Sequence, residues 1–550
     1  MSVNIASHLG ALAESQPYTR AVVYPYGRDR FGRVSYTHYT YQQLDAESDQ
    51  LAHALQERGV RRGVRTVLMV PPSLEFFALT FALFKIGAIP VLVDPGMGVA
   101  NLGQCLREAK PEAFIGIPKA HVARALLGWA RTTINTLVTV GKRAPWGGAT
   151  LAELLTEGGS LEPFAMAETG ANETAAILFT SGSTGVPKGV VYTHGVFAAQ
   201  VESIRTIYGI EPGEIDLPTF PLFALFAPAL GMTAVLPDMD PTRPANVDPL
   251  KIFEAIRDFG ITNMFGSPAL IRRVGEYGAA RGFRLKTLRR VISAGAPVPA
   301  SVLERFASML EPGVQVFTPY GATESLPVAS IGSEEILGET REATDSGRGV
   351  CVGQPVPGMD VRMIRIRDEA IREWSDDLTV RVGEVGEIAV RGPVVTREYF
   401  NRPESTLLAK IHCREDGSFF HRMGDLGYFD SNGRLWFCGR KSQRVATTNE
   451  TLYTVPCEAV FNTHPEVFRT ALVPVRRRGA TEPVLCVELE KNSRVPSQEL
   501  ANELLELGES QKHTSGISTV LFHPSFPVDI RHNAKIFREK LSTWAQKQLS

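Results

Sequence analysis

Cysteine is scarce in this sequence, and no two cysteines stand at metal-binding spacing. The 550 residues contain six scattered cysteines and no CxxC pair: Cys105, Cys351, Cys413, Cys438, Cys457 and Cys486. In a chain of this length, such a distribution predicts free thiols in a reducing compartment and argues against a disulfide scaffold or a zinc site.

Long apolar runs and a strong net charge are also missing. No stretch of about 18 apolar residues occurs, and the first residues, MSVNIASHLGALAESQP, lack the basic and apolar regions of a signal peptide. The 58 basic and 59 acidic residues leave a formal net charge of -1, which excludes a general attraction to nucleic acid or acidic membranes. We therefore expect a cytoplasmic protein without a transmembrane segment or a nucleic-acid partner.

The pattern along the chain predicts an α/β fold with more than one domain. A single core rarely exceeds about 250–300 residues. Helical patterns such as 39–60, with Leu44, Leu51 and Leu55 at helical intervals, alternate with apolar strand patterns such as RTVLMV and IPVLVDP. This alternation predicts mostly parallel sheets flanked by helices.

From about Val361 the pattern changes to short strands separated by Gly and Asp turns, which predicts an antiparallel, β-barrel-like part over about 361–439. A charged connector, Arg440–Arg444, follows, and then mixed helix and strand patterns. We expect an N-terminal domain over 1–440 and a small, mobile α+β C-terminal lid domain over 441–550.

The stretch TSGSTGVPKGVVYTH (180–194) follows the apolar run AAILF and predicts an anion-binding loop. It is not a Walker loop, because Pro187 stands where that motif needs Gly and Gly189 where it needs Ser or Thr. Its glycines can present backbone N–H groups, its hydroxyls can donate, and Lys188 carries a positive charge. A solvent-exposed linker is the alternative, but it would not normally lie between two apolar strands.

This loop resembles the phosphate loop of the acyl-adenylate-forming superfamily, and further motifs of that family follow in order. VISAGAPVP (291–299) resembles the adenine segment, TPYGATES (318–325) the Y-G-x-T-E motif, and MGDLGYF (423–429) the ribose motif. GRKSQR (439–444) resembles the hinge, and HNAKIFREKL (532–541) the segment with the catalytic lysine. The resemblance covers essentially the whole chain.

The resemblance implies a role for each matching residue, with ATP and Mg²⁺ as cofactors. Lys188 and the loop residues would hold the β- and γ-phosphates, Thr323 would contact the α-phosphate, and Glu324 would bind Mg²⁺. The loop residues are Thr180, Ser181, Gly182, Ser183, Thr184 and Gly185.

For the nucleoside, the resemblance implies that Asp425 and Arg440 bind the ribose. The adenine would lie against Gly295, Ala296, Pro297, Tyr320 and Gly321. Lys535 would bridge the carboxylate and the α-phosphate during attack, and Ser442 would be the hinge. The simpler alternatives are a turn-capping Asp425, a loop carboxylate at Glu324 and a surface lysine at Lys535.

The acyl pocket is predicted to be apolar and to lie in FPLFALFAPALG, with Phe220, Phe223, Ala224 and Phe226 as its residues. At least half of these side chains could instead be ordinary core. Many fatty acyl members of the superfamily carry a histidine where this chain has Ala224. We expect a fatty chain, because the segment has no charged or amide-rich stretch.

Two further departures lower the expectation of a standard CoA ligase. Thr451 stands five positions before Pro456, where most thioester-forming members have glycine, and its β-branched side chain should narrow a pantetheine tunnel. Ala534 replaces the usual glycine before the catalytic lysine.

Segments 93–121, 216–241 and 445–465 resemble a narrower group, the β-lactone-forming enzymes of bacterial long-chain olefin biosynthesis. That resemblance implies adenylation of a 2-alkyl-3-hydroxy fatty acid, attack by its own β-hydroxyl, and assembly with other enzymes of the pathway. A long-chain fatty acyl-CoA or acyl-carrier-protein ligase is the alternative function, and a non-catalytic nucleotide-binding scaffold is an alternative of another class.

Overall fold

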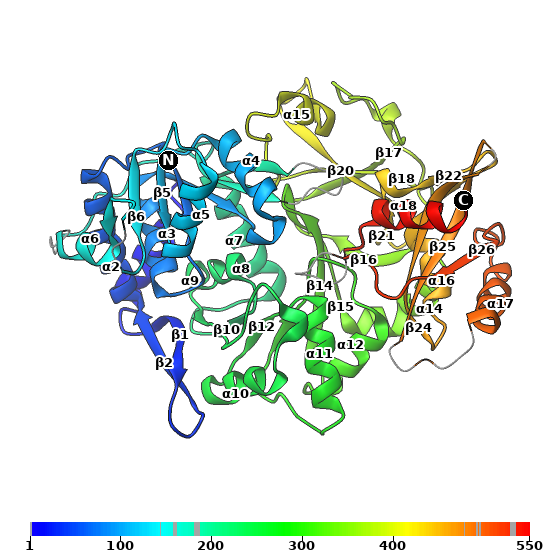
Figure 1. The fold of residues 1–550 in the computed structure, drawn as a ribbon, viewed down its shortest axis with the longest axis horizontal. Coiled ribbons are helices and arrows are strands. Elements are labelled where there is room, and N and C mark those ends of the chain that lie inside the picture. The colour runs from blue at the N-terminus through cyan, green and yellow to red at the C-terminus, as the bar shows by residue number, and fades with distance from the viewer. Residues whose placement is uncertain are drawn as a thin grey trace.

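The computed structural model describes residues 3–142, 145–157, 162–180, 187–477, 479–490, 493, 497–528 and 535–550. Figure 1 shows the N-terminal elements, in blue, and the C-terminal elements, in red, at opposite ends of the long axis. Two large sheets and a small C-terminal sheet follow one another along that axis.

The first sheet has the strand order β7-β6-β5-β3-β4-β8-β9. All neighbours are parallel except β8 and β9. The strands are β3 (Arg65–Met69), β4 (Ile89–Val93), β5 (Ala113–Gly116), β6 (Thr136–Thr139), β7 (Ala149–Thr150), β8 (Thr174–Thr180) and β9 (Lys188–Thr193). The helices of this part are α1 (Ser7–Ser15), α2 (Tyr41–Glu57), α3 (Leu74–Ile86), α4 (Val99–Ala109), α5 (Pro118–Leu127) and α6 (Leu151–Glu157).

Helix α3 is the central buried helix of this part. Ser73 caps its first turn by accepting a hydrogen bond from the Phe76 N–H, and Gly87 ends it with φ of 74°. Nearly all of its side chains are buried, as its continuous apolar sequence requires. Lys85 is buried too, and its Nζ lies 2.7 Å from Asp45 and 2.5 Å from Asp49 on α2.

The second sheet is mixed, with the order β17-β18-β20-β21-β16-β15-β14-β13-β12-β10-β11-β1-β2. Its N-terminal half consists of β1 (Arg20–Arg28), β2 (Val34–Thr40), β10 (Ile215–Pro218), β11 (Thr233–Val235), β12 (Asn263–Phe265), β13 (Arg290–Ile292) and β14 (Gln315–Ala322). The helices that follow are α7 (His194–Tyr208), α8 (Pro221–Ala224), α9 (Phe226–Ala229), α10 (Pro249–Phe259), α11 (Pro268–Ala279) and α12 (Ala300–Ala307).

The hairpin of β14 and β15 turns this sheet from parallel to antiparallel. The antiparallel strands are β15 (Ser325–Gly332), β16 (Val350–Pro355), β17 (Asp360–Ile364), β18 (Gly386–Arg391), β19 (Lys410–His412), β20 (Phe419–Phe429) and β21 (Leu435–Arg440). They are accompanied by α13 (Ser333–Glu335), α14 (Arg341–Asp345) and α15 (Pro403–Ala409). The expected fold class is confirmed, and the antiparallel part continues the parallel sheet through the hairpin instead of standing as a closed unit.

The C-terminal part is a small α+β unit. Its elements are β22 (Val445–Ala446), β23 (Thr451–Leu452), α16 (Thr454–Phe461), β24 (Val467–Arg477), β25 (Ala480–Leu489), α17 (Ser497–Glu509), β26 (Thr519–Phe522) and α18 (Arg538–Gln548). Arg272 of α11 contacts it, with Nη2 3.1 Å from Glu490. The domain boundary near residue 440 stays a prediction. Among the described residues, no helix has the length and apolar character that a membrane crossing requires.

A buried ion pair lies at the amino ends of the parallel strands β10 and β13, at the opposite side of the sheet from the turn between β14 and β15. Nη1 of Arg290, the first residue of β13, lies 2.6 Å from Glu214, just before β10, and their side chains are only 9 % and 3 % exposed. We expect Arg290→Met to lower the free energy of unfolding by about 3–5 kcal/mol, because it leaves a carboxylate buried without its cation. Chemical denaturation measures this change.

The matched control is Arg257→Met, since the Arg257 side chain is 75 % exposed and pairs with an exposed Asp258. That variant should differ from the parent by less than about 0.5 kcal/mol. Equal unfolding midpoints for the two variants would contradict the prediction.

Candidate functional site

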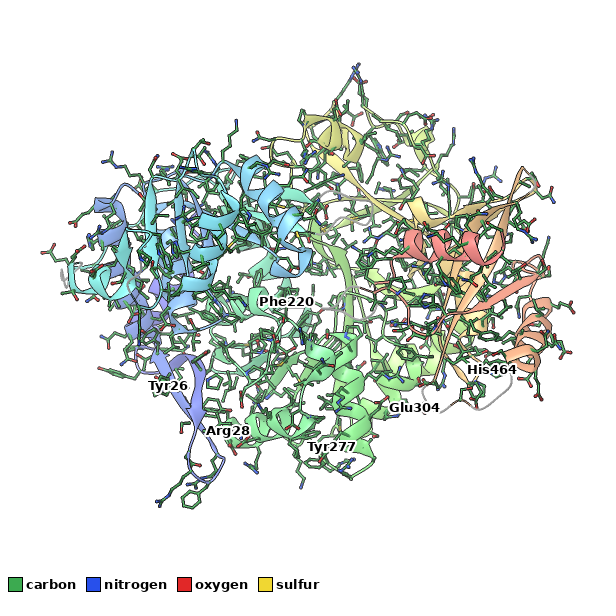
Figure 2. All side chains as sticks on the ribbon, in the orientation of Figure 1. Tyr26, Arg28, Phe220, Tyr277, Glu304 and His464 are labelled. Atoms are coloured by element: carbon green, nitrogen blue, oxygen red, sulfur yellow. The ribbon has the colours of Figure 1, made fainter. Side chains whose placement is uncertain are left out.

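A cavity of about 1470 Å³ lies between the two large sheets and the C-terminal part. It adjoins the carboxyl ends of the parallel strands β3, β4 and β8, where open α/β sheets bind ligands. Figure 2 places Phe220, one of its lining residues, near the middle of the molecule. The cavity exceeds the roughly 300–1,000 Å³ of ordinary small-molecule sites. It therefore has room for more than one compact ligand.

The turn Thr323–Glu324 between β14 and β15 forms one wall of the cavity. The Tyr192 hydroxyl of β9 donates to the Thr323 carbonyl at 2.5 Å. The Thr396 N–H donates to the Glu324 carbonyl at 2.9 Å, and the Tyr399 hydroxyl donates to Glu324 Oε1 at 2.6 Å. These bonds fix both the backbone of the turn and the direction of its carboxylate.

Lys188 begins β9 and also lines the cavity. Its Nζ lies 4.9 Å from the centre of the Tyr399 ring, so the lysine charge and the Glu324 carboxylate share one tyrosine as a neighbour. Thr180 ends β8 and is the direct register partner of Lys188 across the two strands. The predicted loop residues Ser181, Gly182, Ser183, Thr184 and Gly185 lie outside the described residues.

Behind Thr396 lie two buried basic side chains that sequence reasoning missed, Lys410 of β19 and His421 of β20. Lys410 donates from Nζ to the Thr396 carbonyl, and burial lowers the pKa of Lys410 to about 7. Burial also lowers the pKa of His421 well below its usual value, and the charge of Lys410 adds to this shift. His421 lines the cavity, and its Nδ1 has no hydrogen-bond partner. In the sequence, the one sign of these two buried residues is that a basic residue interrupts each apolar strand pattern.

Asp425 and Arg440 face each other across β20 and β21, with Arg440 Nη1 3.0 Å from Asp425 Oδ1. The Tyr320 hydroxyl donates to Oδ2 at 2.7 Å. The carboxylate of Asp425 raises the pKa of the Arg440 guanidinium. Arg440 lines the cavity, whereas Asp425 and Tyr320 lie behind that wall. Oδ1 of Asp425 is buried, and the ion pair with Arg440 is the interaction that balances its charge.

The predicted adenine segment reaches the cavity only in part. Ala294 and Gly295 line it after β13, and Gly295 has φ of 101°, which favours glycine. Gly321 of β14 also lines it. Ala296 is half-buried and Pro297 exposed, and neither belongs to the lining.

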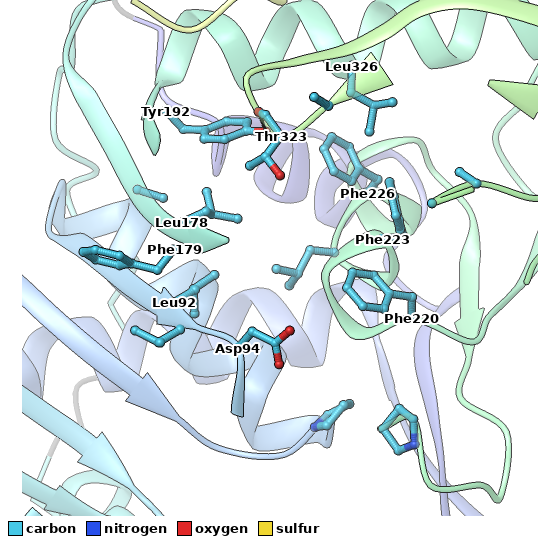
Figure 3. Close-up of a pocket in the computed structure, with 18 of the residues that line it drawn as sticks. Leu92, Asp94, Leu178, Phe179, Tyr192, Phe220, Phe223, Phe226, Thr323 and Leu326 are labelled. Atoms are coloured by element: carbon cyan, nitrogen blue, oxygen red, sulfur yellow. Dashed lines mark hydrogen bonds between the residues drawn. The ribbon is translucent and has the colours of Figure 1, made fainter. Parts of the chain in front are cut away.

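Three of the four predicted acyl-pocket residues line the cavity, namely Phe220, Phe223 and Phe226. Figure 3 shows their rings on one side of the space, with Leu92 and Leu178 on the other. Ala224 differs: it is fully buried among core side chains and does not line the cavity, because the short helix α8 turns it away.

Ser442 and Lys535 bring the C-terminal part to the same cavity, and both line it. Thr451 is exposed on β23 and is no part of the lining, so in this arrangement it narrows no passage to the cavity. Ala534 lies outside the described residues.

The carboxylate of Glu324 suits a hard cation only if other groups supply most of the ligands. Among the described residues, no group of three or more His, Cys, Asp or Glu side chains could hold a metal ion. Mg²⁺ usually binds one or two carboxylates together with phosphate oxygens and water. The site therefore fits Mg²⁺ bound together with a nucleoside triphosphate, and its described residues do not form a cage for the metal alone.

The family profile described as AMP-binding enzyme matches residues 11–400. The chain is 52 % identical to an olefin β-lactone synthetase of Xanthomonas campestris pv. campestris, over 99 % of this chain and 98 % of the other. It is 53 % identical to an olefin β-lactone synthetase of Stenotrophomonas maltophilia, with the same coverage. A long-chain-fatty-acid–CoA ligase of Thermus thermophilus is 27 % identical over 85 % of this chain and 84 % of its own.

Solved structures share the fold. The amide bond synthetase McbA of Marinactinospora thermotolerans superposes with a TM-score of 0.79 at 23 % identity, over 98 % of this chain and 99 % of its own. ATP-bound MatB of Rhodopseudomonas palustris gives 0.79 at 21 % identity over the whole of both chains.

The lowered pKa of Lys410 predicts a pH-dependent cost to the folded state. A lysine that titrates at about 7 when folded and near 10.5 when unfolded destabilises the fold increasingly as pH falls between these values. Lys410→Met removes this cost. Its melting temperature relative to the parent should therefore rise as pH is lowered from 10.5 to 7 and stay level below.

Lys547→Met, at an exposed position of α18, is the control and should show a difference independent of pH. A pH-independent difference for Lys410→Met as well would show that Lys410 titrates at its ordinary value.

Proposed function

The chain belongs to the AMP-binding enzyme family and is an adenylate-forming ligase, and from this premise we propose that it converts a long-chain 2-alkyl-3-hydroxy fatty acid into a β-lactone. The observation that carries the proposal is the identity of 52 % and 53 % to olefin β-lactone synthetases along nearly the full length of the chains. The lining of the cavity supports it, because it combines an apolar space with converging cationic and carboxylate groups.

In the proposed first step, a carboxylate oxygen of the acid bonds to the α-phosphorus of ATP and pyrophosphate leaves. Both reactants are anions, so the site must neutralise charge and align them. Lys188 would hold the departing phosphates, Thr323 the α-phosphate, and Lys535 the carboxylate and the α-phosphate together. Mg²⁺ at Glu324 would offset the charge of the phosphates.

The same geometry supports roles for the nucleoside-binding residues. Arg440 reaches the cavity and Asp425 lies directly behind it in an ion pair, so the ribose hydroxyls would lie against this pair. Gly295 and Gly321 would let the adenine approach the backbone closely, with Ala296, Pro297 and Tyr320 around it. Ser442 would act as the hinge, since it lies between the last strand of the large sheet and the C-terminal part.

In the proposed second step, the β-hydroxyl oxygen bonds to the acyl carbon, the bond from that carbon to the AMP oxygen breaks, and the hydroxyl proton passes to the products or solvent. No thiol is needed. Because the nucleophile belongs to the same molecule as the acyl group, its effective concentration is high, which helps to offset the strain of the four-membered ring.

We further propose a cytoplasmic location and assembly with the enzymes that act before and after this step. The six cysteines are all free and buried, as in proteins of reducing compartments. A substrate and a product with long alkyl chains would favour direct transfer between enzymes, because both are poorly soluble in water.

A long-chain fatty acyl-CoA ligase is the second candidate, favoured by the likeness to the Thermus thermophilus enzyme and by the absence of Thr451 from the cavity lining. We expect the protein, given ATP, Mg²⁺ and a 2-alkyl-3-hydroxy acid without CoA, to release AMP over many turnovers and to form the β-lactone detected by mass spectrometry. AMP release that stops at one equivalent per enzyme and resumes on addition of CoA would instead identify a CoA ligase.

Lys535→Ala should abolish adenylation, because it removes the cation that aligns the carboxylate with the α-phosphate, and should leave the melting temperature nearly unchanged. Substrate-dependent pyrophosphate–ATP exchange measures the first effect. Lys540→Ala is the matched control, since Lys540 is exposed on α18 five positions further on. Exchange at the parental rate in Lys535→Ala would disprove the assignment.

A further inference from the structure

The cavity is lined by residues that belong to both faces of the first sheet. Three pairs of consecutive strand residues line it: Leu68–Met69 of β3, Leu92–Val93 of β4 and Leu178–Phe179 of β8. Consecutive residues of a strand point to opposite faces. A cavity that contacts both members of each pair must therefore pass around the strand ends from one face to the other.

The packing of these six residues confirms the two faces. Met69, Val93 and Phe179 pack with the cluster of Leu102 and Trp129, on the face covered by α4 and α5. Leu68 and Leu92 pack with the cluster of α3, and Leu178 packs with the one that contains Tyr192 and Phe197. The sheet thus separates the cluster on the α4–α5 face from the two clusters on the other face, and residues from both faces line the cavity.

Each face contributes its own apolar walls. On the α4–α5 face the lining includes Leu102, Ala120, Ala123 and Trp129, and we name this space the outer arm. On the other face it includes Phe197, Val201, Ile204 and Phe226, and we name this space the inner arm. Both arms meet at the strand ends, beside the turn Thr323–Glu324.

The outer arm leads toward solvent. Val99, at the start of α4, lines the cavity and is 58 % exposed. Small side chains at Ala120 and Ala123 keep the space beside α5 open, and Trp129 is only 5 % exposed at its wall. A long chain in this arm could bury its first carbons and extend outward beside α4.

From this geometry we propose that the two arms bind the two alkyl chains of one substrate, one chain on each face of the sheet. The proposal rests on the proposed function and specifies how its substrate is held. In a 2-alkyl-3-hydroxy acid, one alkyl chain starts at C2, the carbon next to the carboxylate, and the other starts at C3, the carbon that carries the hydroxyl. Its carboxylate and hydroxyl would therefore lie at the strand ends, facing Thr323 and Lys535, while its chains diverge into the arms.

The arms are tested by filling each with a bulky side chain. Ala123→Trp fills the outer arm and Ile204→Trp the inner arm, and both positions are partly exposed and line the cavity. Acids with two long chains, with a long 2-alkyl chain only, or with a long 3-hydroxyacyl chain only are compared by kcat/KM for pyrophosphate release. Lactone formation is followed separately by mass spectrometry.

We expect both variants to lose about tenfold or more of the parental kcat/KM for the two-chain acid, and to keep most of it for single-chain acids, which can use the open arm. Val99→Trp, at the exposed end of the outer arm, should show the same preference more weakly without disturbing the core. The parental kcat/KM for two-chain acids in both Ala123→Trp and Val99→Trp would overturn the proposal. An equal loss for all acids in Ala123→Trp would also overturn it.

The two readouts separate this proposal from the proposed function. If pyrophosphate release follows the expected pattern but no lactone forms, the result supports the binding of two chains in the two arms and contradicts the proposed lactone formation. If the parent and Ala123→Trp form lactone equally well from the two-chain acid, the result supports the proposed function and shows that the outer arm does not bind a chain.

Discussion

The position of the turn Thr323–Glu324 is the constraint on which the site depends. Tyr192 reaches it from the first sheet, and Thr396 and Tyr399 reach it from the antiparallel part of the second. The turn thus ties together parts of the chain that are distant in sequence. Because hydrogen bonds to buried groups are costly to lose, the bond from Tyr192 opposes a shift of the first sheet relative to the turn, and the bonds from Thr396 and Tyr399 oppose a shift of the antiparallel part. The residues that we propose to contact the α-phosphate and Mg²⁺ therefore sit on a part of the cavity wall that several hydrogen bonds hold in place.

The residues that we propose to bind the nucleoside are also held in place by their neighbours. Asp425 is held between Arg440 and Tyr320, and only Arg440 reaches the cavity surface. Arg440 is also the last residue of β21, directly before the connector that contains Ser442. A ligand that contacts Arg440 would act on the point where the C-terminal part joins the large sheet. The proposed nucleotide contact at Arg440 is thus two residues from Ser442, in the connector to the C-terminal part.

Much of this arrangement could be predicted from the sequence, because the motifs that carry charge lie in turns and strand ends. The fold class and the convergence of Lys188, Glu324, Arg440 and Lys535 on one cavity follow from such patterns. Lys410 and His421 could not be predicted, because a single basic residue in an apolar strand does not show whether it is buried. Ala224 was placed in the pocket from its neighbours, yet the short helix α8 turns it into the core.

The passage of the cavity around the ends of β3, β4 and β8 was equally hidden, since it depends on where each strand stops relative to the next. This shape of the cavity affects how a product with two chains can leave it. A ligand that straddles the strand ends cannot slide out along the axis of either chain, because the sheet edge stands between them. Both chains must withdraw together past the strand ends where the two arms meet, and the slower chain then sets the residence time of the product. Shortening either alkyl chain of the product would therefore raise its dissociation rate by more than the loss of buried apolar area alone would predict.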